Sequence, residues 1–477
     1  MNTVGKPHIV ILGAGPAGVG AAYRLRRMDR ADVTVIEQRS VVGGNAGSFE
    51  MGGQSLDYGS HRLHPACDPT ILEDIRSLLG DDLVRRPRHG RILLQHRWIH
   101  FPLKPLDLLL RADKKFVLGI LRDAIMTSVG RKTRGAATFA SVLRAELGST
   151  ICASFYFPYA RKIWGRPPET LAAVQARKRV SVQSIWGLVR KILIRSPGPT
   201  GDNAGSFYYP RGGYGKISEA YSDAAMAMGA EYHFSSRVMR LVRPSGAGGR
   251  WTIDTDRNGD KRSFQADFVW STIPVSLLAR MIEPAAPTEV VRSAESLEFR
   301  SMILIYLQLP IHRFTEFDAH YFPESHLSIT RLSEPKNYAG ATFPEGRTTL
   351  CAELPCSVDD AEWSMSDDDL GALVVDDLNR AGVPLECSPS AVRVKRIREA
   401  YPIYARDYQR HFAGLDEWVH QLPGFLSYGR QGLFVHDNTH HALAMAYAAA
   451  DCITDGDFDK VRWQTYREEF ESHVVED

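Results

Sequence analysis

Three glycines and one acidic residue near the N-terminus carry the clearest chemical signal in this chain. Gly13, Gly15 and Gly18 follow a short apolar run, and Glu37 stands nineteen residues after Gly18. The first glycine permits a tight turn, the second lets backbone N–H groups approach a pyrophosphate, and the third allows a helix to pack closely on a strand. A carboxylate at this distance can accept hydrogen bonds from a ribose. The pattern predicts a dinucleotide site whose turn is lined by Gly13, Gly15, Pro16, Ala17 and Gly18.

The segments around this motif have the patterns of the elements that must hold it. Residues 8–12 form a continuous apolar run typical of a buried strand, residues 19–28 follow as a helix, and residues 33–36 form a second apolar strand that ends at Glu37. Because strand, glycine turn, helix, strand and acid follow in register, we interpret the unit as Rossmann-like. The predicted fold class is α/β.

The residues around and after Glu37 select among the dinucleotides. An acid in this position favours a ribose with a free 2′-hydroxyl, which indicates NAD or FAD and not NADP. Gly43 and Gly44 form a glycine doublet similar to the second fingerprint of FAD-dependent oxidoreductases, although an ordinary glycine turn has the same composition. No second GxGxxG follows an apolar strand, so no separate nicotinamide site is predicted. The predicted cofactor is FAD, and its binding residues in this segment are Glu37, Gln38, Arg39, Gly43, Gly44 and Asn45.

The length of the chain limits the number of domains to expect, and its net charge limits the kinds of partner. A protein of 477 residues exceeds what a single core usually supports, so two interleaved domains are expected. The net charge of +2 gives no reason to expect a nucleic-acid partner. We expect an FAD-binding domain of residues 1–85, 205–275 and 395–477, and an α+β substrate domain of residues 86–204 and 276–394.

Cysteine usage and the N-terminal sequence bear on location and metals. The six cysteines are scattered with no CxxC pair, which suits a reducing compartment and argues against a structural zinc site. The adjacent His440 and His441 cannot both face one ion from a regular helix, so no metal ligand is predicted. The first strand begins within ten residues of Met1, which leaves no room for a signal peptide, and no apolar run reaches transmembrane length. A cytoplasmic location is therefore expected.

Positive charge is concentrated in the central part of the chain. Residues 85–134 contain thirteen Lys/Arg and three Asp/Glu, with apolar runs between them, and residues 161–195 contain nine Lys/Arg and one acid. A basic amphipathic segment can lie on an anionic membrane or guide an anionic substrate towards a cleft. The alternative is a solvated helical face around a buried apolar stripe. The expected partners are a small-molecule substrate, with an anionic or phosphorylated one as an option, and a membrane surface contacted peripherally through residues 85–134.

Several separate blocks resemble one known group of enzymes. Residues 56–62 are similar to an aspartate–x–glycine–x–histidine segment, residues 209–213 to a proline/glycine turn before a helix, and residues 270–274 to a strand end over the nucleotide domain. With the block at residues 429–445, they resemble the FAD-dependent amine oxidase and protoporphyrinogen oxidase-like flavoproteins, to which UDP-galactopyranose mutase is related. The resemblance implies a discontinuous FAD-binding domain of the GR2 type. It adds to the predicted cofactor residues Gly59, Ser60, His61, Val238, Thr272, Gly429, Arg430, Asn438 and Met445.

The resemblance implies an FAD-dependent oxidoreductase. Its substrate would give a hydride from a C–H bond, next to nitrogen, oxygen or a conjugated system, to flavin N5. Oxygen or another acceptor would then reoxidise the flavin. The candidate catalytic residues beside the ring are His61 for proton handling, Arg62 for charge and His64 as a third. His61 has an alternative role, in which it only orders the loop through backbone hydrogen bonds.

A second interpretation is a mutase-like flavoenzyme that acts on a nucleotide sugar through reduced flavin N5. Residues 157–168 are similar to a mutase segment whose aromatic rings pack on uracil, and they suit a helix end in a core equally well. Gln183 stands where the mutases carry an arginine, and a glutamine cannot supply a bidentate cation to a diphosphate. A flavin-binding protein without catalysis is a third interpretation. The candidate substrate residues are Tyr159, Arg161, Trp164 and Arg179.

Overall fold

The structure, a computed structural model, describes residues 6–102, 111–128, 138–179, 205–246, 248–340 and 344–475. Gln183 and parts of both basic stretches lie outside these ranges. The backbone of Arg179, at the end of a helix, is described, but its side chain is not.

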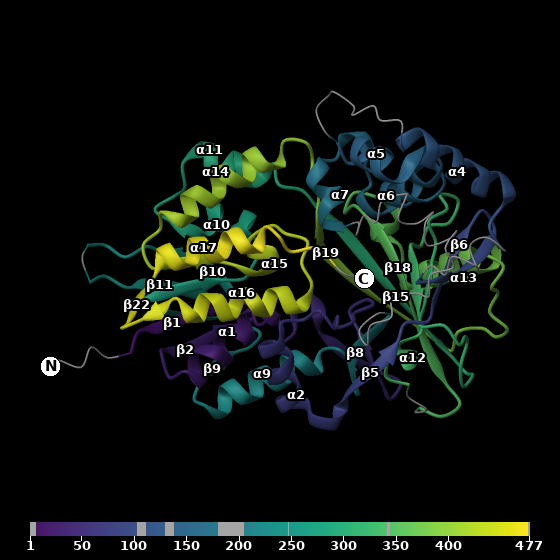
Figure 1. The fold of residues 1–477 in the computed structure, drawn as a ribbon. Coiled ribbons are helices and arrows are strands. Elements are labelled where there is room, and N and C mark those ends of the chain that lie inside the picture. The colour runs from purple at the N-terminus through teal and green to yellow at the C-terminus, as the bar shows by residue number, and fades with distance from the viewer. Residues whose placement is uncertain are drawn as a thin grey trace.

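A five-stranded sheet of parallel strands forms the centre of one half of the molecule (Figure 1). Adjacent strands run parallel throughout this sheet, so their carboxyl ends meet at one edge. The two strands predicted on either side of the glycine turn pair with each other, as expected. In spatial order the sheet contains β20 (Phe425–Ser427), β13 (Phe268–Ser271), β1 (His8–Leu12), β2 (Asp32–Ile36) and β9 (Glu231–His233).

Both faces of this sheet are buried, as is usual for parallel sheets. Ile9 and Ile11 of β1 pack on a helical layer, while Val10 and Leu12 point into the opposite core. Within the layer the first helix after the glycine turn contacts α9 and α16. The layer comprises α1 (Pro16–Arg27), α2 (Pro69–Leu79), α9 (Lys216–Ala227), α16 (Thr439–Asp451) and α17 (Lys460–Phe470).

The opposite core is covered by a four-stranded sheet and three helices. Leu278, Val290 and Leu297 pack with Val10 in this core, so residues 275–297 lie with the parallel sheet. Their apolar helical pattern does not reveal which sheet they cover, so the sequence alone predicts a substrate segment that begins at residue 276. The sheet contains β12 (Asp260–Ala266), β11 (Trp251–Arg257), β10 (Arg237–Val242) and β14 (Ile282–Glu283), and the helices are α10 (Val275–Met281), α11 (Thr288–Glu295) and α14 (Tyr408–His420).

A seven-stranded mixed sheet forms the other half. Its longest strands alternate between two cores: Ile303 and Ile305 of β15 pack under α13 (Asp367–Arg380), whereas Leu304 and Tyr306 face the other side together with Leu56. This second face of the sheet therefore packs against the segment that follows the glycine doublet. The sheet contains, in order, β19 (Ala391–Pro402), β15 (Phe299–Leu309), β18 (Thr348–Cys356), β17 (Arg331–Ser333), β16 (Ala319–Tyr321), β6 (Gly90–Leu94) and β7 (Arg97–Phe101).

A separate helical layer with its own core covers the end of this half (Figure 1). It comprises α4 (Lys114–Ser128), α5 (Phe139–Ile151), α6 (Phe157–Trp164) and α7 (Ala173–Arg179). The described chain also contains short strands and α-helices: β3 (Ser48–Met51), β4 (Gln54–Asp57), β5 (Leu83–Pro87), β8 (Ser206–Pro210), α12 (Pro335–Ala339), α15 (Gly429–Gly432), β21 (Ile453–Thr454) and β22 (Asp457–Phe458). Within the described ranges, no helix is both long and apolar enough to span a bilayer. The fold is mixed α/β around a parallel sheet, which agrees with the predicted class.

Candidate cofactor and active site

The glycine turn lies at the carboxyl ends of β1 and β13. Gly13 has a φ of +98°, and its N–H donates to the Ile36 carbonyl at 2.8 Å, which closes the turn onto β2. A Cβ on Gly13 would lie 2.6 Å from Thr272 Oγ1, and a Cβ on Gly18 would lie 1.9 Å from the Gly13 carbonyl oxygen. Neither position has room for a side chain. The turn leads into α1, whose N-terminal N–H groups and dipole suit a phosphate.

The glycine doublet packs against this turn. The Gly43 N–H donates to the Ala14 carbonyl at 2.8 Å, and a Cβ on Gly44 would lie 3.2 Å from the Gly15 Cα. Arg39 Nη1 holds the doublet by donating to the Gly44 carbonyl at 2.7 Å. Two backbone segments without side chains therefore lie in contact, the arrangement expected of a loop that passes close to a dinucleotide.

Glu37 is buried at the end of β2. Its carboxylate oxygens accept the N–H groups of Ala14 at 2.7 Å and of Arg39 at 2.8 Å. A carboxylate offers about four lone-pair sites, so capacity remains for ribose hydroxyls. The Ser236 N–H donates to the Glu37 carbonyl at 2.9 Å, which brings the start of β10, with the half-buried Val238, close to the acid.

The predicted C-terminal block reaches the same edge. The Tyr428 hydroxyl donates to the Ala17 carbonyl at 3.4 Å, so Gly429 and the short helix α15 lie beside α1. Arg430 Nη2 donates to the Ala400 carbonyl at 2.8 Å, which connects this block to β19 of the other half. The fold thus gathers sequence from both ends of the chain around the glycine turn.

The other predicted cofactor residues differ in their surroundings. Asn438 is the N-cap residue of α16, and Asn45 Nδ2 donates to the Glu399 carbonyl at 3.2 Å. Gln38 is exposed to solvent. Met445 is 0% exposed in the helical layer, so protein alone covers it and leaves no surface for a cofactor.

One loop, which begins at Asp57, joins the two halves of the molecule. The buried Asp57 carboxylate accepts the Tyr209 hydroxyl at 2.6 Å, the Ser48 hydroxyl at 2.7 Å and the Tyr214 N–H at 2.7 Å. Burial raises the pKa of Asp57 to about 6, and these three hydrogen bonds oppose the rise. The Tyr306 hydroxyl of β15 donates to the Asp57 carbonyl at 2.6 Å, which ties the loop to the seven-stranded sheet.

An ion pair that the sequence analysis missed lies next to this loop. Glu353 of β18 pairs with Arg331 of β17, with 2.7 Å between Oε1 and Nη2, and the same oxygen accepts the Ser60 N–H at 2.9 Å. The Ser60 hydroxyl also contacts the Tyr338 hydroxyl. The signal available in the sequence was a lone acid inside the apolar run 348–356, because a buried charge needs a partner.

His61 is held in a neutral state beside this pair. Its ring stacks on Tyr214, with centroids 5.3 Å apart. Burial, together with the charges of Arg331 and Arg430, lowers the pKa of His61 to about 3. Its imidazole is therefore uncharged at neutral pH, which suits orientation and hydrogen bonding and does not provide a cation.

Arg62 and His64, the other two predicted catalytic residues, are occupied by local contacts. Arg62 Nη2 lies 3.3 Å from Asp318 Oδ1, and its guanidinium carbon lies 5.0 Å from the ring centroid of Tyr338. His64 Nδ1 accepts the Ala66 N–H at 3.1 Å. Arg62 is thus a paired cation stacked on an aromatic ring, and His64 stabilises a turn.

The residues predicted to bind substrate do not form one cluster among the described side chains. Trp164 is 3% exposed and packs edge-on against His436 and Tyr401, so it belongs to a core, the alternative that the sequence left open. Arg161 is exposed to solvent. Tyr159 is half-buried and packs against the end of the seven-stranded sheet. The side chain of Arg179 lies outside the described set.

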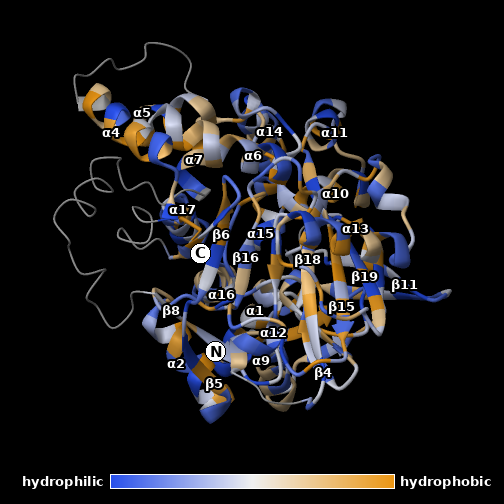
Figure 2. Cartoon of the chain, turned by 90° about the vertical axis from the view of Figure 1, so that its right-hand side faces the viewer, coloured by the Kyte–Doolittle hydropathy of each residue, from blue (hydrophilic) through white to orange (hydrophobic). Residues whose placement is uncertain are grey.

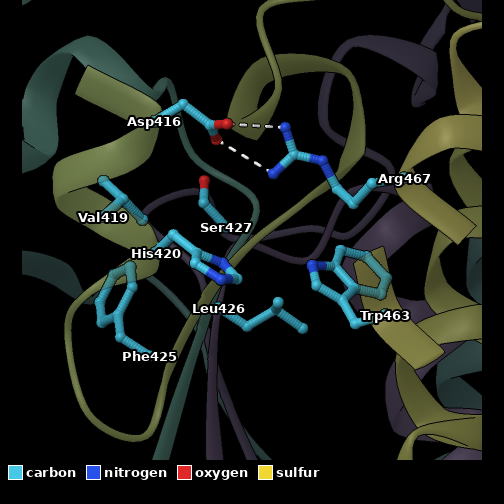
Figure 3. Close-up of a pocket in the computed structure, with 8 residues that line it drawn as sticks. All are labelled: Asp416, Val419, His420, Phe425, Leu426, Ser427, Trp463 and Arg467. Carbon is cyan, nitrogen blue, oxygen red and sulfur yellow. Dashed lines mark hydrogen bonds and ion pairs between the residues drawn. The ribbon is translucent and has the colours of Figure 1, made fainter. Parts of the chain in front are cut away.

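Figure 3 shows a small pocket between α14, β20 and α17. Its volume of about 10 Å³ admits at most one water molecule. Arg467 and Asp416 close it through a bidentate pair with N···O distances of 3.0 and 2.8 Å. No residue predicted to bind cofactor or substrate lines this pocket, so it is a packing gap and not an active site.

The glycine turn, the acid and the doublet at the carboxyl edge of a parallel sheet are the features expected of an α/β protein that binds a dinucleotide. The chain matches the family described as flavin containing amine oxidoreductase over residues 16–448, and it belongs to that family. It is an FAD-dependent oxidoreductase, as the sequence analysis predicted.

Individual relatives extend this comparison. Coproporphyrinogen III oxidase of Mycobacterium tuberculosis is 24% identical over 421 residues, which cover 83% of this chain and 86% of the relative. Phytoene dehydrogenase of Streptomyces griseus is 27% identical over 265 residues, so the match spans only 51% of the length of either protein. A crystal structure of reduced UDP-galactopyranose mutase is similar in fold, with a TM-score of 0.80 and 20% identity over 94% of each chain.

Proposed function

We propose that FAD lies along the carboxyl edge of the parallel sheet, in a discontinuous Rossmann-like domain of the GR2 type. The glycine turn would hold the pyrophosphate, Glu37 the ribose and the strand at Val238 the adenine. The absence of room for a Cβ at Gly13 and Gly18 supports this assignment. With residues 275–297 placed on the parallel sheet and β19 in the seven-stranded sheet, the FAD domain comprises residues 1–85, 205–297 and 403–477, interleaved with a substrate domain of residues 86–204 and 298–402.

The flavin ring is assigned to the loop that begins at Asp57. The observation that carries this assignment is the hydrogen bond from Ser60 to Glu353, because it puts the loop between the edge of one sheet and a buried face of the other. When bound there, FAD accepts a hydride from a substrate C–H bond. The residues of this chain orient the substrate, exclude water and set the local charge.

The substrate is proposed to be a small anionic molecule. Burial lowers the pKa of His61 and the charges of Arg331 and Arg430 lower it further, because both guanidinium groups lie near its ring. Two guanidinium groups near one site can bind a carboxylate or a phosphate. The buried Nε of Arg331 has no hydrogen-bond partner among the described residues, which leaves one donor for the anion.

Anaerobic reduction of the bound flavin tests this proposal. Amines, carboxylated porphyrinogens, polyenes and nucleotide sugars are offered in turn to the wild type and to Arg331→Lys, which keeps a charge for Glu353 but lacks the Nε donor. An anionic compound should bleach the flavin, and its KM should rise about tenfold in the variant, with a smaller change in kcat.

Two other outcomes would revise the proposal. Bleaching by neutral compounds only would contradict an anionic substrate and leave the oxidoreductase assignment intact. Turnover of a nucleotide sugar only after flavin reduction, without net oxidation, would instead support the mutase-like activity.

We also propose peripheral contact with an anionic membrane through α4. Leu118, Leu121 and Ile125 are spaced by three and four residues, so they share one helical face, and they are 65, 36 and 62% exposed. Lys115 and Arg122 are exposed on the same helix. Figure 2 shows apolar and polar segments alternating along α4 at the margin of the molecule. A basic amphipathic helix of this kind suits the interface of an anionic bilayer.

Co-sedimentation with phosphatidylserine and phosphatidylcholine vesicles tests the membrane contact. The double variant Leu118→Gln, Leu121→Gln should bind phosphatidylserine vesicles about tenfold more weakly, because it lacks two exposed apolar side chains that would be buried in the bilayer. Val461→Gln is the control, since Val461 is an exposed apolar residue on α17. Equal binding of all three proteins, or equal binding to both lipids, contradicts the proposal.

A further inference from the structure

Two loops meet at one edge of the seven-stranded sheet because the strands before them run parallel. Strand β6 pairs with β16 in parallel. The turn after β6 and the loop after β16 therefore leave the sheet at the same edge. The turn carries His96, and the loop carries Glu324 and His326.

Three side chains from these loops direct their metal-binding atoms at one another. Glu324 Oε2 lies 3.3 Å from His326 Nδ1 and 3.7 Å from His96 Nδ1, and the ligand atoms of all three lie within 4.8 Å of one another. A tetrahedral ion with bonds of about 2.1 Å to nitrogen and oxygen holds its ligand atoms roughly 3.4 Å apart. The two separations from Glu324 Oε2 are close to that spacing and the third is at most 4.8 Å, so an ion requires the two histidine side chains to move towards each other by no more than about 1.4 Å.

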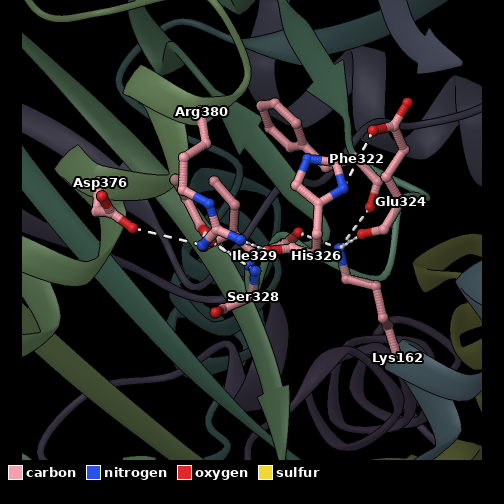
Figure 4. A network of polar contacts seen from close by, with 9 residues as sticks. Lys162, Phe322, Glu324, His326, Ser328, Ile329, Asp376 and Arg380 are labelled. Carbon is pink, nitrogen blue, oxygen red and sulfur yellow. Dashed lines mark hydrogen bonds and ion pairs between the residues drawn. The ribbon is translucent and has the colours of Figure 1, made fainter. Parts of the chain in front are cut away.

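Neighbouring groups hold these ligands in place. The backbone N–H of His96 donates to Glu324 Oε1 at 2.8 Å. This hydrogen bond fixes the carboxylate and leaves Oε2 near both imidazole rings. Lys162 of α6 donates from Nζ to the carbonyls of Phe322 and Ile329 at 2.6 Å each, and of Glu324 at 3.2 Å (Figure 4). The backbone of the loop is therefore anchored from the inside. Outer hydrogen bonds of this kind orient metal ligands and raise the affinity of a site.

We propose that His96, Glu324 and His326 bind one divalent transition-metal ion of the zinc class. Two imidazole nitrogens with one carboxylate favour zinc, nickel or copper over magnesium and calcium, which prefer oxygen ligands. The side chains of His96 and His326 are 78 and 37% exposed, so the ion has access from solvent. Three protein ligands leave a coordination position for water. The bound ion would join the turn after β6 to the loop after β16, separately from the residues assigned to the flavin.

A second group of possible ligands in the described chain does not support a site. Asp437, His441 and His473 also lie close together. However, His441 Nδ1 accepts the Asn438 N–H at 3.2 Å, at the N-cap of α16. A ring nitrogen in that role has no lone pair left for a metal. The hydrogen bonds therefore distinguish a helix cap from the proposed ligand set.

Calorimetric titration of Zn²⁺ into the flavin-loaded protein tests the proposal. The wild type should bind one ion per chain, and Glu324→Gln and His326→Ala should each weaken binding on the order of 100-fold. His411→Ala is the matched control, because His411 is also a histidine close to a carboxylate, with 3.6 Å between Nε2 and Asp407 Oδ2. The control should bind zinc as the wild type does, and flavin absorbance should be the same in all four proteins.

Co²⁺ provides a second readout at the same site. Cobalt bound by these ligands should give visible d–d absorption that added Zn²⁺ removes, and Glu324→Gln and His326→Ala should lack it. Equal zinc affinity in the wild type and both ligand variants would overturn the proposal, because the ion would then lie elsewhere or bind adventitiously. Failure of the wild type to show saturable binding of Zn²⁺, Ni²⁺ or Cu²⁺ would overturn it as well.

Discussion

The edge of the parallel sheet and the inner face of the seven-stranded sheet meet at one loop, but they are built in different ways. At the edge the groups proposed to bind the cofactor are backbone N–H groups, whose positions depend on glycines such as Gly13 and Gly18. On the seven-stranded sheet the groups proposed to face the substrate are charged side chains, and Arg331 and Glu353 are stable there because they are paired. A cofactor common to many enzymes suits the first arrangement, and a substrate that differs between enzymes suits the second.

The two regions should therefore be sensitive to different kinds of substitution. The backbone region has no space for an added atom, so the insertion of a single methyl group disrupts it. The side-chain region tolerates changes of volume better than the removal of one charge, because the remaining charge stays buried without a partner.

The largest effect is expected from Gly18→Ala in the backbone region. Its Cβ would lie 1.9 Å from the Gly13 carbonyl oxygen, so α1 and the turn must move apart. Overpacking of this kind costs about 3 kcal/mol, and the displaced turn should no longer hold FAD. The purified variant should lack flavin absorbance.

The control for this variant is Gly414→Ala, which should retain flavin. The nearest atom to a Cβ at that position is Ser293 Oγ at 3.7 Å, an ordinary contact. A full flavin content in Gly18→Ala would contradict the view that the close approach of backbone groups forms the site.

The next effect is expected from Glu353→Gln in the side-chain region, which should lose stability to a similar extent but leaves the glycine turn intact. The change leaves the Arg331 guanidinium buried without a counter-charge, so the free energy of unfolding should fall by about 3 kcal/mol in denaturant titrations. The double variant Glu353→Gln, Arg331→Met should recover most of this loss, because it removes both charges. A double variant as unstable as the sum of the two single variants would show that the pair has no coupling.

The same contrast explains how much the sequence could predict. Gly13, Glu37 and Gly43 lie in one short segment, where spacing alone encodes the turn, the acid and the doublet. Arg331 and Glu353 are far from Ser60 in the chain, and no local sequence pattern predicts which loop they will contact. The backbone region and the parallel sheet were therefore predictable, and the ion pair became visible only in the folded chain.

Trp164 and residues 276–297 show the opposite problem. A tryptophan in a suggestive motif was predicted to bind substrate, yet it is buried in a helical core. The helices after residue 275 were assigned to the substrate domain, yet they pack on the parallel sheet. An apolar pattern predicts that a side chain will be buried, but it does not predict which layer that side chain will pack against.

Asp57 lies where the two regions meet, and the protonation state of its carboxyl should change the stability of the protein with pH. Its pKa of about 6 in the folded protein exceeds the ordinary value of 3.8. Between these values the folded protein binds more protons than the unfolded chain, so this carboxyl makes the free energy of unfolding fall as pH rises from about 4 to about 6.

The variant Asp57→Asn cannot titrate and should lose this contribution. The difference in unfolding free energy between wild type and variant should therefore change by on the order of 2 kcal/mol across that pH range, in denaturant titrations at fixed ionic strength. A difference that stays constant from pH 4 to pH 6 would show that the three hydrogen bonds to Asp57 outweigh its burial.

The smallest effect is expected at Met445, where the sequence analysis predicted a cofactor contact. Met445 is 0% exposed in the layer where α16 packs on α1. Exchange for leucine preserves its approximate volume and should cost less than about 1.5 kcal/mol. A flavin spectrum identical to that of the wild type, with this small loss of stability, places Met445 in the core and limits the cofactor region to the edge of the sheet. A shifted flavin absorption maximum at unchanged stability would instead extend the cofactor region into the helical layer, because only contact with the ring would change its spectrum without changing the packing.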